Sequence, residues 1–127
     1  MKSIDLYSAT LSLDRDRVLL VRYKDGIEID LAESKKLITA ALELINENPC
    51  YVLMDATDVF SAMDHQSRKY LSEHEELNRL TIAQAIVVNS AHIRLLANFY
   101  LKFYHHTYPV KMFSNVKAGR EWLLSNS

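Results

Sequence analysis

The chain has little cysteine, glycine and proline, and each scarcity excludes a class of structure. Cys50 is the single cysteine among 127 residues, so no disulfide can form within the chain, and one thiol is typical of a protein in a reducing compartment. No base lies beside Cys50 in the sequence, so we expect a small apolar residue at the start of a strand rather than a nucleophile. Two glycines and two prolines predict long regular elements joined by short turns.

The chain also lacks long apolar runs and an excess of charge of either sign. Its longest apolar stretches, residues 18–21 and 85–88, fall far short of the ~20 residues that span a bilayer, and residues 1–5 have no signal-peptide character. We therefore expect a cytoplasmic protein that is neither exported nor inserted in a membrane. A formal net charge of -1 argues against a nucleic-acid binder and against a polybasic membrane patch.

What is present predicts alternating strands and helices after a β-rich start. Apolar segments with turn signals between them predict an N-terminal β-hairpin within residues 7–23, followed by an Asp-Gly turn and an extended lead-in. Asp30, with Glu33 three residues on, predicts the N-cap and capping box of a helix over residues 31–45. Further strands are predicted at residues 51–54, 82–88 and 110–113, and further helices begin at Asp64 or Ser61, at residues 89–90 and at residues 114–115.

This order predicts one α/β sandwich over residues 1–127. Alternation of strand and helix requires crossover connections, which produce a mostly parallel sheet with helices on its faces. We expect about five mostly parallel strands and four helices. The second helix is expected to run without a break through Tyr70, Leu71, His74 and Leu77, which share one face.

Two segments carry a resemblance to a known group. In YVLMDATDV (residues 51–59) an apolar strand ends in Asp and leads into a small polar pair, and MFSN (residues 112–115) is followed by Ala118 and by Trp122-Leu123. Together with the element order, these segments resemble the STAS and SpoIIAA-like superfamily, small α/β domains named after anti-sigma-factor antagonists of bacterial sporulation. The resemblance implies a non-catalytic regulatory module with a functional loop after Asp55.

The chain departs from that family at the phosphorylated position. STAS antagonists usually carry an Asp-Ser pair at the start of the helix after this strand, and the Ser is phosphorylated. Here Asp64 and His65 align with the pair, and Ser61 and Ser67 are in a different register. The resemblance therefore implies a SpoIIAA-like relative without the phosphoserine switch, in a branch proposed to bind lipids or other apolar ligands.

Two groups of residues are candidate sites. The first is the loop at the carboxyl end of a predicted parallel strand, where open α/β sheets bind ligands; the alternative is a solvated loop whose side chains only cap the next helix. The second is an aromatic helix, which predicts the wall of an apolar pocket or a dimer face, or else ordinary core packing. The loop residues are Asp55, Thr57, Asp58, Ser61, Asp64 and His65, and the aromatic residues are Phe99, Tyr100, Phe103 and Tyr104.

These observations leave three functional hypotheses open. The first is a regulatory or protein-interaction module that uses the loop after Asp55, with a protein partner and a homodimeric state. The second is a carrier of a lipid or another small apolar ligand, and the third, with the least support, is an enzyme that uses Asp55, Asp58 and His65. Because no nucleotide-binding, nucleophile-elbow or metal-ligand motif occurs, we expect no catalysis, no cofactor and no metal.

Overall fold

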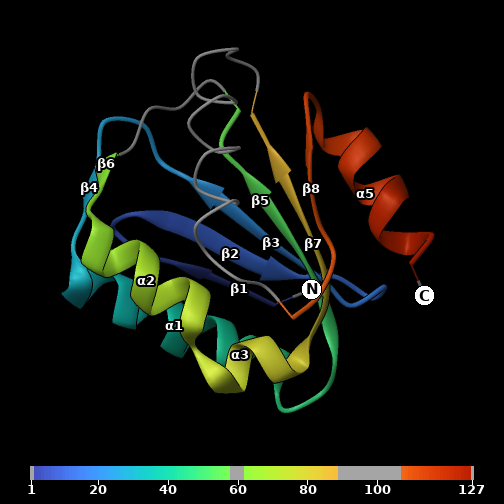
Figure 1. Ribbon diagram of the computed structural model, residues 1–127, viewed down its shortest axis with the longest axis horizontal. Coiled ribbons are helices and arrows are strands. Elements are labelled where there is room, and N and C mark those ends of the chain that lie inside the picture. The colour runs from blue at the N-terminus through green and yellow to red at the C-terminus, as the bar shows by residue number, and fades with distance from the viewer. Residues whose placement is uncertain (1, 58–61, 89–106, 127) are drawn as a thin grey trace.

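The computed structural model describes residues 2–57, 62–88 and 107–126, with the backbone alone at 62 and 63. These residues form a mixed sheet with helices on both faces (Figure 1). The six-stranded sheet has the order β1-β2-β3-β5-β7-β8, and a second sheet pairs β4 with β6. The strands are β1 (Lys2–Asp5), β2 (Ala9–Leu13), β3 (Val18–Tyr23), β4 (Glu28–Ile29), β5 (Cys50–Asp55), β6 (Ala62–Met63), β7 (Thr81–Val87) and β8 (Val110–Phe113).

The predicted α/β class is confirmed, with one more strand in the main sheet than expected. β1, β2 and β3 are antiparallel neighbours, whereas β3, β5, β7 and β8 pair in parallel. Residues 2–5 carry a weak strand signal of their own, and their pairing with residues 10–13 makes them a strand. The predicted N-terminal hairpin, β2 with β3, is therefore part of a three-stranded antiparallel unit, and β3 joins this unit to the parallel half.

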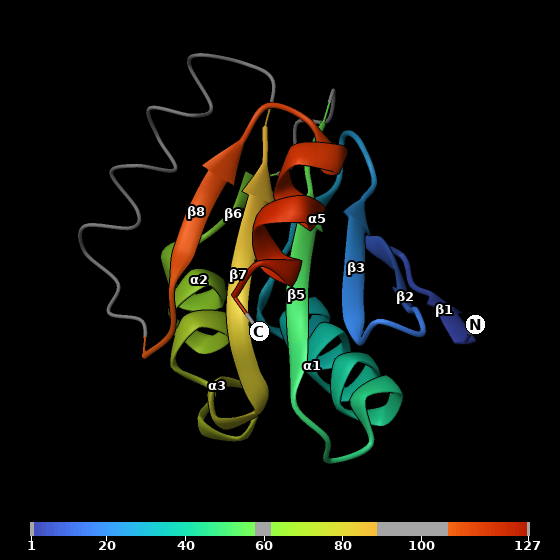
Figure 2. The same cartoon turned by 90° about the vertical axis from the view of Figure 1, so that its right-hand side faces the viewer.

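Four described helices cover the two faces of the sheet. α1 packs on β1 and β2, and α2 and α3 lie on the same side, whereas α5 covers β5, β7 and β8 on the opposite side (Figure 2). Leu37, Ala41 and Ile45 of α1 join the core on the first side, and Leu123 of α5 joins the core on the second. The helices are α1 (Leu31–Ile45), α2 (His65–Glu73), α3 (Glu75–Leu80) and α5 (Val116–Leu124).

The predicted helix starts are confirmed at three positions. The side chains of Asp30, Asp64 and Asn115 accept hydrogen bonds from backbone N–H groups three residues ahead, at 2.8, 2.7 and 2.8 Å. Such N-caps satisfy donors that have no partner within the helix. The reciprocal half of the capping box at Glu33 was predicted wrongly: its carboxylate accepts the amide of Ser8, 3.2 Å away, and lies buried against the turn between β1 and β2.

The second predicted helix is broken at His74, contrary to expectation. His74 has extended backbone angles and ends α2, while its Nδ1 accepts the amide of Leu77 at 3.3 Å and so caps α3. The side-chain amide of Asn78 donates to the carbonyl of Ser72 at 2.9 Å, which satisfies an acceptor at the end of α2. Apolar periodicity continues through the break, because both helices pack on the same core.

Arg17 joins the β2–β3 turn to the end of α1. Its φ of 64° is in the left-handed region that non-glycine residues rarely occupy. Its guanidinium donates to the carbonyls of Ile45 at 2.7 Å, Asn48 at 2.8 Å and Pro49 at 3.2 Å. One side chain thus satisfies three acceptors around the C-terminus of a helix, where a cation is also favoured by the helix dipole.

We expect Arg17→Ala to lower the free energy of unfolding by about 1.5 kcal/mol, because charge-assisted hydrogen bonds are lost. Arg17→Gly loses the same bonds but adopts the left-handed conformation without the ~1 kcal/mol penalty of other residues, so it should cost about 0.5 kcal/mol. Urea unfolding of both variants measures the difference. Equal losses in the two variants would contradict a strained backbone at this position.

Candidate functional site

The predicted loop begins at the carboxyl edge of the parallel strands. Strand pairing places Asp5, Thr10, Arg22, Asp55 and Val87 in one row across five neighbouring strands. Four members of this row are polar, and they lie in two hydrogen-bonded pairs: Thr10 Oγ1 donates to Asp5 at 3.0 Å, and Arg22 Nε donates to Asp55 at 3.1 Å. The edge from which the loop leaves β5 is therefore polar and internally bonded.

Asp55 is buried and held from two sides. Its side chain is 9% exposed, whereas that of Arg22 is 62% exposed, so the ion pair has one buried and one solvated partner. Asp55 also accepts the amide of Thr57 at 3.0 Å. Burial raises the pKa of this carboxyl, but hydrogen bonds from Thr57 and Arg22 lower it by more, and the pKa lies below its usual value of 3.8. Asp55 is thus an ionised anchor for the start of the loop.

Asp64 and His65 form the start of α2. Asp64 is exposed and accepts the amide of Ser67, and hydrogen bonding from Ser67 holds its pKa below 3.8. His65 is the first residue of the helix and is also exposed. The carboxylate therefore caps the helix, while the imidazole, aligned with the serine position of STAS antagonists, faces solvent.

The serine nearest to that position is not accessible. Ser67 is 0% exposed, so a kinase could not reach its hydroxyl in this conformation. By contrast, the neighbouring side chains of Gln66, Arg68 and Lys69 are exposed. The outer surface of α2 therefore offers amide and cationic groups in place of a phosphoacceptor.

Several predicted site residues lie outside the described part of the chain. These include two loop residues and the whole aromatic group, so the apolar pocket, the dimer face and the catalytic hypothesis remain predictions. The residues concerned are Asp58, Ser61, Phe99, Tyr100, Phe103 and Tyr104. Of the predicted loop set, the structure describes Asp55, Thr57, Asp64 and His65, and it places them on two elements, the end of β5 and the beginning of α2.

One polar cluster lies beside α3 and includes Tyr108, which follows the predicted aromatic group by four residues. The Tyr108 hydroxyl is 3.4 Å from both Asn78 Oδ1 and Gln84 Oε1, and the Gln84 amide contacts the Met54 sulfur. Tyr108 is therefore joined to α3 and β7 by polar contacts.

Sequence reasoning missed Arg22. Its signal was present, because it is the only charged residue between Val18 and Tyr23 in an otherwise apolar strand, and such a residue needs a partner or solvent. The partner, Asp55, is 33 residues away and becomes a neighbour through the parallel pairing of β3 with β5.

Residues 2–57, 62–88 and 107–126 contain neither a metal-binding cluster nor a membrane-spanning helix. No group of three or more His, Cys, Asp or Glu side chains is arranged to hold a metal ion. No helix in these ranges combines the length and apolar character needed to cross a membrane.

Comparisons with known proteins bear on the family and the fold. A family model described as a domain of unknown function, DUF7793, matches residues 11–126. The chain is similar to the crystal structure of an uncharacterized protein of the DUF3478 family, with a SpoIIAA-like fold, from Shewanella loihica PV-4. The identity is 15%, the TM-score is 0.65, and the match covers 97% of this chain and 99% of the other. No curated protein sequence matches significantly. The predicted SpoIIAA-like resemblance is thus confirmed as a fold.

Proposed function

We propose that this chain, which belongs to the DUF7793 family and has a SpoIIAA-like fold, is a non-catalytic protein-interaction module that binds its partner through the outer surface of α2. One observation carries the proposal. Both described carboxylates of the predicted loop, Asp55 and Asp64, are used internally, as an anchor and as a helix cap. Beside them, α2 exposes His65, Gln66 and Lys69.

The same geometry gives little support to the enzyme hypothesis. A general acid or base needs a pKa near the working pH, whereas hydrogen bonds hold the pKa of Asp55 and of Asp64 below 3.8. Both groups stay ionised at neutral pH, where their role is to accept hydrogen bonds. An interaction surface needs only exposed side chains on a rigid element, and α2 packs against α1.

A photo-crosslinking experiment tests the proposal. The photoreactive residue p-benzoylphenylalanine is placed at Gln66, and in a control chain at Glu43, which is exposed near the other end of α1. In the cells that produce the protein, we expect irradiation to yield a defined protein adduct from position 66 and none from position 43. Adducts of equal yield at both positions, or none at position 66, would contradict an interaction surface on α2.

A further inference from the structure

We propose that the partner presents an acidic segment, which binds to a cationic surface formed jointly by the N-terminal halves of α1 and α2. This inference rests on the proposed function and names the chemistry of its partner. The cationic surface consists of Lys35 and Lys36 of α1 with Arg68 and Lys69 of α2, and all four side chains are exposed.

The fold places these two helix halves side by side. β4 pairs in parallel with β6, so that Ile29 lies opposite Met63, and each strand is followed at once by a helix cap, Asp30 or Asp64. α1 and α2 therefore start at the same level and pack against each other (Figure 1). Measured from their caps, Lys35 and Lys69 occupy equivalent positions in the two helices.

The four cations form no ion pair, unlike several other cations in the described part of the chain. Arg22, Lys24, Arg79 and Arg120 each form an ion pair. Among the described residues, Lys35, Lys36, Arg68 and Lys69 form none within 4.0 Å.

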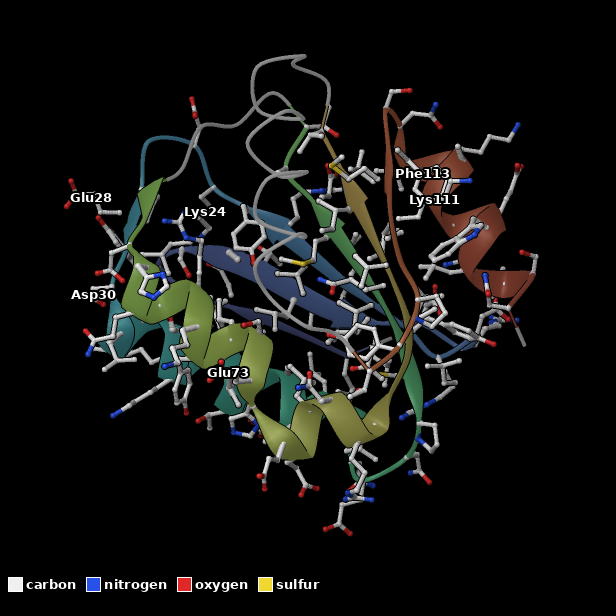
Figure 3. The ribbon with its side chains drawn as sticks, in the orientation of Figure 1. Lys24, Glu28, Asp30, Glu73, Lys111 and Phe113 are labelled. Atoms are coloured by element: carbon white, nitrogen blue, oxygen red, sulfur yellow. The ribbon has the colours of Figure 1, made fainter. Side chains whose placement is uncertain are left out.

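The carboxylates around the surface offset its charge only in part. Asp30 and Asp64 accept helix N–H groups, so their negative charge lies against the positive ends of the two helix dipoles. Glu28, next to Asp30, and Glu73, at the last residue of α2, lie at opposite ends of the surface (Figure 3). The second turns between them carry the four cations.

An acidic protein segment fits this surface better than a larger polyanion does. Four cations on two helix turns match a short stretch of carboxylates, and complementary charge at an exposed interface increases association rate and specificity. Duplex DNA requires broad neutralisation of phosphates, and a formal net charge of -1 provides no excess of cations for it.

A charge-reversal experiment on the full chain tests the inference. The probe is a fluorescein-labelled deca-glutamate peptide, and binding is followed by fluorescence anisotropy at low salt. We expect the double variant Arg68→Glu, Lys69→Glu to weaken binding about tenfold, because two attractive exposed charges become repulsive. The matched control is Lys2→Glu with Lys117→Glu, two exposed cations outside the surface and without an ion pair among the described residues; it should change binding less than twofold.

Three results of the binding experiment would overturn the inference. They are equal binding by parent and double variant, an equal loss in the control, and tighter binding of duplex DNA or of phosphatidylserine vesicles through the same residues. The Gln66 crosslink separates this inference from the proposed function. An adduct that persists undiminished in the Arg68→Glu, Lys69→Glu chain would leave the interaction module standing without an acidic partner. Selective peptide binding with no adduct in the parent would support the cationic surface and contradict a cellular protein partner at Gln66.

Discussion

Replacement of Asp55 by alanine is expected to lower the free energy of unfolding by about 2.5 kcal/mol at pH 7. The buried carboxylate accepts hydrogen bonds from the Thr57 amide and from Arg22, and hydrogen bonds to a charged group contribute roughly 1.5–3 kcal/mol. Asp55→Asn keeps an acceptor for Thr57 but loses the charge that faces Arg22. It should therefore lose about half as much, as measured by urea unfolding.

The pH dependence of this difference follows from the lowered pKa of Asp55. Because its pKa in the folded protein lies below the unperturbed value of 3.8, the carboxylate contributes stability that is present above that value and is lost as pH falls through the folded pKa. The gap between the parent and Asp55→Asn should be full at pH 7 and pH 5 and should shrink at pH 3. A gap of constant size over this range would show that the charge of Asp55 contributes nothing.

Replacement of Leu53 by alanine is expected to lower the free energy of unfolding by about 3 kcal/mol. Leu53 is 2% exposed in the core between the sheet and α5, and leucine-to-alanine changes in such cores cost roughly 2–5 kcal/mol. Guanidinium unfolding at neutral pH measures the loss. A loss below 1 kcal/mol would mean that α5 moves inward and fills the cavity.

Gly119 of α5 provides an internal control for this contact. A Cβ at Gly119 would lie 3.1 Å from Leu53 Cδ1. In the parent, Gly119→Ala therefore gains about 1 kcal/mol of helix propensity, and the tight contact with Leu53 opposes this gain. In the Leu53→Ala background the contact is gone, and Gly119→Ala should recover about 1 kcal/mol. Unfolding of the parent, the two single variants and the double variant gives the coupling energy between positions 53 and 119. Additivity of the two changes within about 0.3 kcal/mol would contradict the close contact between Gly119 and Leu53.

Several features were predictable from the sequence because their cause is local. Asp30, Asp64 and Asn115 cap helices through hydrogen bonds that reach only three residues ahead, and Gly26 occupies a turn with a φ of 72° that suits glycine. The strands at residues 51–54, 82–88 and 110–113 were recognised from short apolar runs between turn signals. Alternation of these elements then predicted the α/β class.

Other features could not be read from the chain because their partners are distant. The Glu33 carboxylate obeys the capping-box spacing, yet it accepts the amide of Ser8, 25 residues away. His74 suits a continuous apolar face, but its ring caps a new helix. At Glu33 a tertiary hydrogen bond replaced the predicted local one. At His74 a local capping bond interrupted the predicted continuous helix.

The sequence by itself determined that α1, α2 and α5 begin after Asp30, Asp64 and Asn115, that residues 51–54 lie in a buried strand, and that the loop after Asp55 leaves the edge of a parallel sheet. Only the tertiary structure decided that Arg22 binds Asp55 and that α1, which carries Lys35 and Lys36, packs against α2, which carries Arg68 and Lys69. The physical reason is the distance along the chain over which each kind of interaction acts. Capping and periodicity act over three or four residues, whereas ion pairs and shared surfaces depend on strand pairing between segments more than thirty residues apart.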